Sequence, residues 1–252
     1  MSGLFDKHGG FRRLNSFTLA TIVQLETLRF CRRFLTQDPR EAEGKFYDPK
    51  GRQYDQMTQA ARSGRQNIIE GSERSSTSKD TEMKLTDVGR ASLGELRGDY
   101  EIFILDREEL PWSQHSAEAK ELNAISLDAA EFSDDMVHES AKHALRQRRK
   151  FARWLDSKDP VVVANAMLLI IGRALNMLKN QIEAQGRAFE ESGGFSERLM
   201  SKRLEAREKS REPSPECPKC GKAMRRRQSA KGEFWGCSGF PECKGTREAG
   251  PH

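Results

Sequence analysis

Hydrophobic residues recur every three or four positions through most of the first 190 residues, which is the spacing of one face of a helix. The pattern covers residues 14–36, 52–71, 80–106 and 131–155. A last long segment begins after Asp159 with Pro160, a residue that is tolerated in the first turn of a helix. Its apolar positions follow the spacing of a helical bundle as far as Ile182. We therefore expect a mainly α protein, with strands only after residue 215.

Glycines, prolines and capping residues indicate where these helices begin and end. Gly71 lies where the second helix is expected to stop, and Ser78 is the expected N-cap of the third. The stretch 107–130 is acidic and contains Pro111, so we expect it to be irregular. Gly193–Gly194 is expected to end the last long helix.

The same signals divide the chain into two folded parts and a linker. Residues 10–195 are expected to form a helical bundle with an inserted segment at 107–158 that carries an extra helix. Residues 196–215 are expected to form a charged helical linker that ends in the proline-rich hinge EPSPE. Residues 216–248 are expected to form a small β domain.

Charge is distributed unevenly along the 252 residues, which carry a formal net charge of +5. Residues 1–195 sum to −1, whereas residues 196–252 sum to +6. Within the first part, 106–139 carries −8 and 140–195 carries +5. Charged residues make up 32% of the chain, but its regular apolar spacing is not that of a disordered protein. A partner would therefore meet local fields of opposite sign, which decay over about 8 Å at physiological salt.

No run of 18–20 uninterrupted apolar residues occurs, so we expect no transmembrane helix and no membrane partner. The first residues, MSGLFDKHGGFRR, lack the apolar core of a secretory signal. We therefore expect a cytoplasmic protein.

Four of the five cysteines lie close together, as Cys217-x2-Cys220 and, after sixteen residues, Cys237-x5-Cys243. In a reducing compartment this spacing favours a metal site. Four thiolates bind one structural Zn²⁺ tetrahedrally and leave no open position for catalysis. The alternative is free or disulfide-bonded cysteine. Cys31 stands alone in an apolar segment and is expected to be a core residue.

Basic and aromatic residues surround this cluster. The candidates for nucleic-acid contact are Lys222, Arg225, Arg226, Arg227, Phe234, Trp235, Phe240 and Lys244. Basic groups contact phosphates, and aromatic faces stack on unpaired bases. The alternative is that the aromatic residues form the small core over the metal, and we expect at least one of the three to do so.

The segment CPKCGKAMRRRQSAKGEFWGCSGFPECKGT closely resembles the C-terminal zinc ribbons of type IA DNA topoisomerases. The resemblance covers about 30 residues, and its second half is the more specific. It implies a four-cysteine zinc ribbon of a kind generally associated with single-stranded DNA. It does not imply topoisomerase activity, which requires a large catalytic domain with a nucleophilic tyrosine.

A second resemblance begins at RSGRQNIIEGSER, residues 62–74, and continues through LTDVGRASLGEL, residues 85–96. The family pattern is met by Ser63, Asn67, Ile68, Glu70, Gly71 and Arg74. These segments resemble the four-helix-bundle proteins encoded in intervening sequences of 23S ribosomal RNA genes, the accessory proteins of diversity-generating retroelements and the four-helix-bundle suffix proteins. The resemblance implies an up-and-down four-helix bundle that forms a homo-oligomer, often a pentamer, with a basic surface. Retroelement relatives bind nucleic acid and a reverse transcriptase.

The motif also has a simpler physical interpretation. Asn67, Glu70 and Arg74 share one helix face. A hydrogen-bond network between helices is at least as good an explanation as a functional site.

The run KHALRQRRKFAR has six basic residues and no acid of its own. Its candidate nucleic-acid contacts are Arg146, Arg148, Arg149, Lys150 and Arg153. The alternative is a solvated helix face. His138 and His143, five residues apart, are expected to be surface residues rather than a metal site.

The sequence bears on three classes of function. The first is a non-catalytic protein that binds DNA or RNA, with an oligomeric basic bundle and a zinc ribbon for single strands. The alternative is a protein-interaction scaffold, such as an accessory subunit of a reverse transcriptase, whose acidic 106–139 segment docks a basic partner or folds back on its own basic helix. An enzyme is not expected, because no phosphate loop, nucleophile–base pair or dispersed carboxylate set is present in the sequence.

Overall fold

The computed structural model describes residues 10–75, 77–192, 195–209, 214–229 and 232–248. The chain divides into two compact units, Met1–Phe195 and Ser196–His252. The described part is mainly helical, with a small antiparallel sheet near its C-terminal end.

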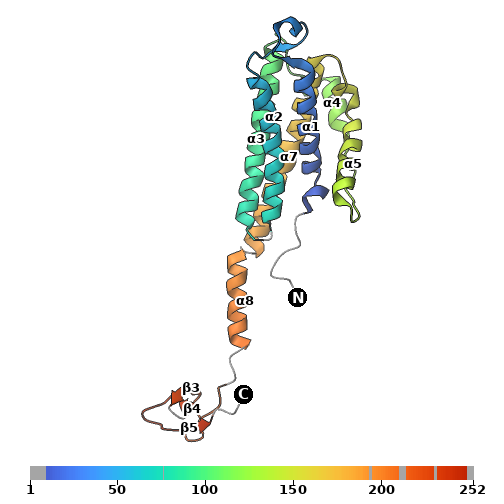
Figure 1. Ribbon diagram of the computed structural model, residues 1–252. Coiled ribbons are helices and arrows are strands. Elements are labelled where there is room, and N and C mark those ends of the chain that lie inside the picture. The colour runs from blue at the N-terminus through green and yellow to red at the C-terminus, as the bar shows by residue number, and fades with distance from the viewer. Residues whose placement is uncertain (1–9, 76, 193–194, 210–213, 230–231, 249–252) are drawn as a thin grey trace. The chain divides into compact units, whose positions relative to one another are not determined.

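Four long helices lie side by side in the first unit (Figure 1). They are α1 (Asn15–Phe34), α2 (Arg52–Arg74), α3 (Lys79–Leu105) and α7 (Pro160–Ser192). They correspond to four of the five expected helical segments, with shifted ends. Ser78 caps α3 as expected, since its side chain accepts a hydrogen bond from the backbone N–H of Thr81.

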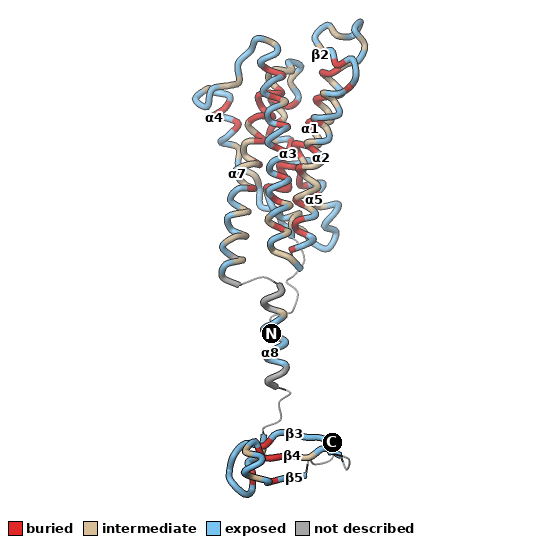
Figure 2. The backbone as a smooth tube through the Cα atoms, turned by 90° about the vertical axis from the view of Figure 1, so that its left-hand side faces the viewer, coloured by how far each residue is buried: buried red, intermediate tan, exposed pale blue. Residues whose placement is uncertain are grey.

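The inner faces of these helices form one core, seen as the buried stretches of Figure 2. At its centre the ring of Phe30 packs edge-on against Tyr100 and Phe103, at centroid distances of 5.0 and 4.8 Å. The buried hydroxyl of Tyr100 donates to Thr27 Oγ1 at 3.0 Å. Cys31 is fully buried in this core, which confirms its expected role.

Gly71 does not end α2, which continues to Arg74. It is buried inside the helix, where a Cβ atom would lie 3.1 Å from the carbonyl oxygen of Glu82. Gly64, one heptad earlier, is also buried against α3, beside Gly89 and Leu93. At these positions glycine therefore allows α2 and α3 to pack closely and does not end the helix.

The inserted segment is more ordered than expected and contains three helices. These are α4 (Ala117–Ala124), α5 (Met136–Arg149) and α6 (Ala152–Leu155). The expected irregular stretch 107–130 thus holds α4, and the expected single helix 131–155 begins later and is broken after Arg149. Arg173 of α7 fixes the end of α4 by donating to the carbonyl oxygens of Leu122 and Ile125, at 3.3 and 2.7 Å.

Strands are not confined to the C-terminal unit. β1 (Leu35–Thr36) and β2 (Phe46–Tyr47) form a two-residue parallel pair after α1. Two short 3₁₀ helices, Gly10–Arg13 and Pro39–Glu41, complete the first unit.

One helix meets the length and hydropathy criteria for a membrane span, although the sequence has no uninterrupted apolar run of that length. Residues Pro160–Arg187 of α7 are long and apolar enough, with a mean hydropathy of 1.9 over the most apolar 18 residues. More than half of that stretch is buried within the protein, as in the core helix of a soluble fold. One such helix is weak grounds for a membrane location.

All of α8 (Phe195–Lys209) except its first residue belongs to the second unit, where a helical linker was expected. The Gly193–Gly194 pair lies outside the described residues, as does part of the EPSPE hinge. A three-stranded antiparallel sheet follows, in the order β3 (Met224–Ser229), β4 (Gly232–Cys237) and β5 (Thr246–Glu248).

Candidate metal centre and nucleic-acid interface

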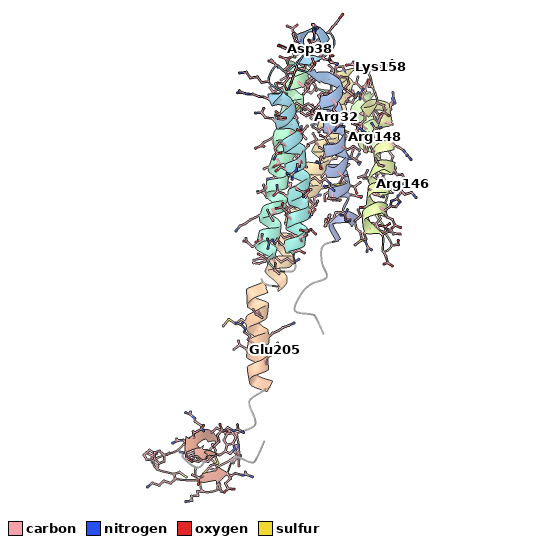
Figure 3. The ribbon with its side chains drawn as sticks, viewed as in Figure 1. Arg32, Asp38, Arg146, Arg148, Lys158 and Glu205 are labelled. Carbon is pink, nitrogen blue, oxygen red and sulfur yellow. The ribbon has the colours of Figure 1, made fainter. Side chains whose placement is uncertain are left out.

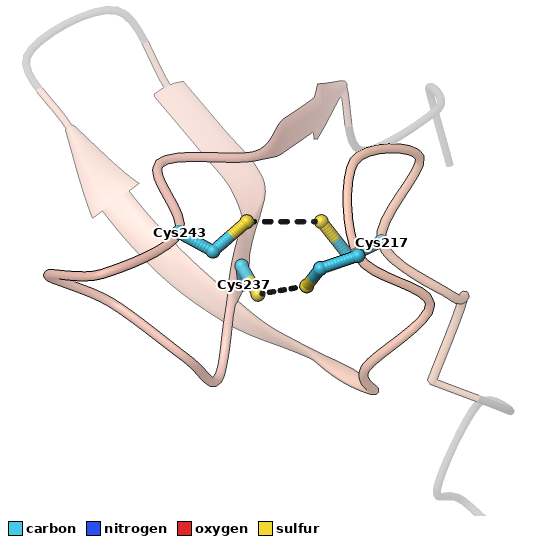
Figure 4. Close-up of side chains that lie close together, drawn as sticks. Cys217, Cys237 and Cys243 are labelled. Atoms are coloured by element: carbon cyan, nitrogen blue, oxygen red, sulfur yellow. Dashed lines mark hydrogen bonds between the residues drawn. The ribbon is translucent and has the colours of Figure 1, made fainter.

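The four clustered cysteines converge on one point. Their Sγ atoms all lie within 4.8 Å of one another, with 3.7 Å between Cys217 and Cys243 and 3.4 Å between Cys220 and Cys237 (Figure 4). A tetrahedral zinc with Zn–S bonds of about 2.3 Å requires sulfur–sulfur separations of about 3.8 Å. The donor set is therefore that of one structural Zn²⁺, as expected.

Backbone geometry prepares the first pair of ligands. Gly221, at a φ of +72°, closes the turn after Cys220, and its N–H donates to the carbonyl oxygen of Cys217 at 2.9 Å. Backbone N–H groups, first that of Lys219, lower the pKa of the Cys217 thiol to about 7. These N–H groups favour the thiolate of Cys217, whereas burial and the neighbouring sulfurs raise the pKa of Cys237.

Glycines also shape the second half of the site. Gly239 donates its N–H to Cys237 Sγ at 3.3 Å. A Cβ atom on Gly245 would lie 2.3 Å from Cys217 Sγ, so no larger residue fits beside the cluster. Gly245 is a site residue that was not predicted, although its position two residues after Cys243 is visible in the sequence.

The sheet separates the surrounding side chains into two faces. Strand register pairs Met224 with Cys237 and Arg226 with Trp235, so these four share the metal-side face. Trp235 packs against the buried cluster of Cys217, Met224 and Cys237. At least one aromatic residue was expected to cover the metal, and Trp235 does so.

The opposite face carries Arg225, Arg227 and Phe234. Arg227 lies across Gly236, where a Cβ atom would be 2.9 Å from Arg227 Cδ. Its guanidinium carbon is 5.3 Å from the ring centroid of Phe240, which is 54% exposed. The result is a solvent-facing arginine–aromatic surface, formed by Arg225, Arg227, Phe234 and Phe240, which we call the Arg–Phe face.

Among the other predicted residues of this unit, Arg226 and Trp235 lie on the metal-side face. Arg226 is 5.6 Å from the Trp235 ring and forms an ion pair with Glu233 at 3.3 Å. Lys222 packs beside Gly239, near the Cys237 sulfur, and Lys244 is exposed. Arg247, a basic residue of the same segment, pairs with Trp235 across the strands.

These features agree with the comparisons with known proteins. Residues 214–251 match the family model described as the topoisomerase DNA binding C4 zinc finger. The tail carries a topoisomerase-type C4 zinc ribbon. A stretch of 34 residues is 50% identical to the plasmid DNA topoisomerase I of Xylella fastidiosa (strain 9a5c). That match spans 14% of this chain and 5% of the topoisomerase, so the ribbon is what the two share. No solved structure matches the chain.

The basic run of α5 and α6 is not the free surface that was expected, because acids from other segments pair with it. Arg148 is buried between α5 and α1, where it binds Glu26, whereas Arg146 lies on the outer side of α5 (Figure 3). The prediction that Arg148 contacts nucleic acid is therefore wrong, because its side chain is buried in an ion pair.

The acidic insertion supplies the partners of the remaining residues in this run. Asp128 pairs with Lys150 at 2.6 Å and lies 3.6 Å from Arg146, and Glu121 pairs with Arg153. Arg149 is exposed. The acidic insertion thus folds back on the protein's own basic helix, one of the two arrangements considered from the sequence.

His143 is buried, which corrects its expected place on the surface. Burial, followed by the nearby charge of Arg146, lowers its pKa. His138 is exposed, as expected.

The motif in α2 is part of the contact between α2 and α3. Asn67 donates to the backbone oxygen of Ser63 at 2.9 Å, and the Ser63 hydroxyl lies 3.0 Å from that of Ser92 in α3. Gly71 provides close packing, whereas Glu70 and Arg74 are exposed. Of the two interpretations weighed, the contacts of Ser63, Asn67 and Gly71 favour the network between helices.

Proposed function

We propose that this protein binds nucleic acid without catalysing a reaction, and that its zinc ribbon makes the principal contact. The observation that carries the proposal is the Arg–Phe face, where two arginines and two phenylalanines share one solvent-facing side of the sheet. Arginines bind phosphates, and an exposed ring offers a stacking surface. The matched family model is also one for a DNA-binding zinc finger.

Single strands are the proposed ligand. A base can stack on Phe240 only when it is not already stacked within a duplex, so the exposed ring favours unpaired nucleotides. Arg225 and Arg227 project from the same face and would contact the backbone phosphates. Nothing in this surface discriminates DNA from RNA, so both belong in the test.

The zinc is proposed to be structural. Four thiolates complete a tetrahedral zinc and leave no position for water or substrate. We infer that the metal holds the Arg–Phe face in place and takes no part in chemistry. A cytoplasmic location, where thiols stay reduced, fits this role.

We interpret the packing of α1, α2, α3 and α7 as an up-and-down four-helix bundle and propose that it self-associates. Support comes from the outer side of α3, where Val88, Ala91, Gly98, Ile102 and Leu105 are exposed at intervals of three, four or seven residues. Ile102 is 65% exposed. These five residues, which we call the α3 seam, follow the seven-residue spacing through which helices of a coiled coil pack together. A pentamer is the state that the family resemblance implies.

Self-association would place several ribbons on one assembly. Linked weak sites gain affinity through their effective concentration. Sedimentation of the wild type and of Ile102→Asp would test the α3 seam, because only the wild type should form the larger species.

The alternative, a scaffold or reverse transcriptase accessory subunit, rests on the acidic insertion. Two of its acids, Glu121 and Asp128, already pair with the protein's own Arg153 and Lys150. The acids that would attract a basic partner are therefore partly neutralised, and we favour nucleic-acid binding.

The test is a set of fluorescence anisotropy titrations of the full chain with labelled single-stranded DNA, duplex DNA and single-stranded RNA. Phe240→Ala should weaken single-strand binding several-fold and leave the weaker duplex binding unchanged. Arg247→Met, which removes a charge from the metal-side face, is the matched control and should have a smaller effect. Equal binding by Phe240→Ala and the wild type would contradict the proposed stacking surface.

A further inference from the structure

Two arginines of the helical unit, Arg12 and Arg65, line one cavity. Arg12 donates to the Ser140 hydroxyl of α5 at 3.1 Å, and Arg65 of α2 donates to the Thr21 hydroxyl of α1 at 3.0 Å. Both line the same cavity of about 200 Å³, whose walls also include Thr18. None of the described residues that line this cavity is acidic.

The environment of these two cations calls for a negative charge. Both arginines are half-buried, and the Arg65 guanidinium lies 4.8 Å from the centroid of the Phe17 ring. Burial, followed by the nearby charge of Arg12, lowers the pKa of Arg65. Within the described residues, no carboxylate pairs with either arginine. Two neighbouring cations held partly away from water are costly unless an anion joins them.

The cavity continues into an apolar groove between α1 and α5. This groove has a volume of about 320 Å³ and shares Arg65, Thr21, Ala141 and Ala144 with the arginine cavity. Its other walls are mostly aliphatic, formed by Ile22, Leu25, Leu28 and Leu145 with Gln24 as the one further polar residue among the described lining. It offers neither an aromatic ring for stacking nor an array of polar groups for reading a base.

We propose that α1, α2 and α5 form a binding site for a small amphiphile with an oxyanion head and an aliphatic chain. The head, a carboxylate or a phosphate, binds between Arg12 and Arg65, beside the hydroxyls of Thr18, Thr21 and Ser140. The chain lies in the groove and reaches Leu145. A guanidinium donates in a planar fork that matches either oxyanion, and aliphatic walls bury the chain.

This site is separate from the Arg–Phe face, so it neither requires nor supports the proposed binding of nucleic acid. A polynucleotide phosphate would use the arginines but would leave the aliphatic groove empty. The two ligands therefore differ in whether the alkyl chain contributes to affinity.

The test is calorimetric titration of the full chain with sodium decanoate and with decyl phosphate, each below its critical micelle concentration. Decyl maltoside supplies the same chain with a neutral head, and inorganic phosphate supplies the head alone. Both charged amphiphiles should bind at least about 10-fold more tightly than either control, since charge-assisted hydrogen bonds discriminate by that factor or more. The stronger of the two identifies the preferred head.

Variants test each end of the site. Arg65→Met should weaken both charged amphiphiles about 10-fold or more, whereas Arg97→Met, on the exposed side of α3, should not. Leu145→Asp, which places a charge in the groove, should also weaken binding of both charged amphiphiles. Leu110→Asp, at an exposed leucine outside the groove, should not. Leu145 is exposed enough for the fold to tolerate the change, so this variant keeps the test valid if Arg65→Met unfolds.

Two results would overturn the proposal. One is equal binding of decyl maltoside and the charged amphiphiles, which would show that the arginines do not select an anion. The other is binding of decanoate and decyl phosphate that none of the groove or arginine variants changes.

Discussion

The guanidinium of Arg148 donates to both carboxylate oxygens of Glu26, at 3.0 and 2.9 Å. Arg148 also donates to Asp156 at 3.0 Å, so a single side chain joins α1, α5 and the residue that follows α6. Only 2% of Glu26 and 8% of Arg148 are exposed. This buried pair anchors the inserted segment on the core helices.

Removing one partner of this pair should be strongly destabilising. Arg148→Met leaves the buried Glu26 carboxylate with Arg29 alone, at 2.7 Å, and should lower the free energy of unfolding by about 3 kcal/mol, the low end for a broken buried pair. Urea unfolding followed by circular dichroism measures the change. Arg149→Met, at the exposed neighbouring position, should stay within about 0.5 kcal/mol of the wild type. Equal stability of the two variants would show that the pair does not anchor α5.

The contact between α2 and α3 depends on glycine at position 64. A Cβ atom there would lie 2.5 Å from Leu93 Cδ2 and 3.3 Å from the backbone oxygen of Gly89, so Gly64→Ala should force the helices apart. We expect a loss of about 1–3 kcal/mol in thermal or urea unfolding. Gly94→Ala, where the added methyl group meets open space on α3, should instead be neutral or stabilising by up to about 1 kcal/mol. A stabilising Gly64→Ala would refute the close approach.

Stability should depend on pH through Asp128. Hydrogen bonds from Lys150 and then Gln147 lower the pKa of this carboxyl from 3.8 to about 2. Because the folded pKa is lower than the unfolded one, this stabilisation is present above about pH 4 and is lost as pH falls toward 2. Asp128→Asn should remove that part of the pH dependence, and Asp134→Asn should preserve it. Parallel stability curves for Asp128→Asn and the wild type between pH 5 and 2 would contradict the assignment.

Metal removal should unfold the ribbon and spare the helical unit. About 35 residues bury too little apolar surface to fold without their metal. Mass spectrometry of the native protein should find one zinc per chain, and Cys220→Ser should lose it, whereas Cys31→Ala should retain it. After chelation, the amide signals of β3–β5 should collapse while the helical circular dichroism persists. Persistence of those signals without metal would show that zinc is not structural.

Much of this structure could be predicted from local patterns. The three- and four-residue apolar spacing identified α1, α2, α3 and α7, because each buries one face. The cysteine spacing identified the metal ligands, because each close pair needs only a short turn to aim two sulfurs at one point.

Other features depend on partners that are distant in the sequence. Arg148 looked accessible within its basic run, but Glu26 lies 122 residues away. Gly71 looked like a helix stop because its packing partner, Glu82, lies across the turn in α3. The short α4 has too few residues for a periodic signal, and the contacts of Arg173 hold it in place.

Predicting the Arg–Phe face requires the strand register as well as the amino-acid composition. Within the run Arg225–Arg227, alternation puts Arg226 on the metal side and the other two outside. From the sequence alone, all three arginines were predicted to contact nucleic acid. Register therefore reduces a set of eight candidate residues in the ribbon to a surface that can be tested residue by residue.

The Arg–Phe face is proposed to bind the phosphates of single-stranded nucleic acid, and the salt dependence of binding tests this claim most directly. Anisotropy titrations of a labelled single-stranded oligonucleotide should give a logarithm of affinity that falls linearly with the logarithm of salt concentration. Replacing Arg225 and Arg227 together by Met should reduce the slope by about 1.4, near 0.7 for each lost phosphate contact on a single strand. A wild-type affinity that is independent of salt, or an unchanged slope in the double variant, would contradict the claim.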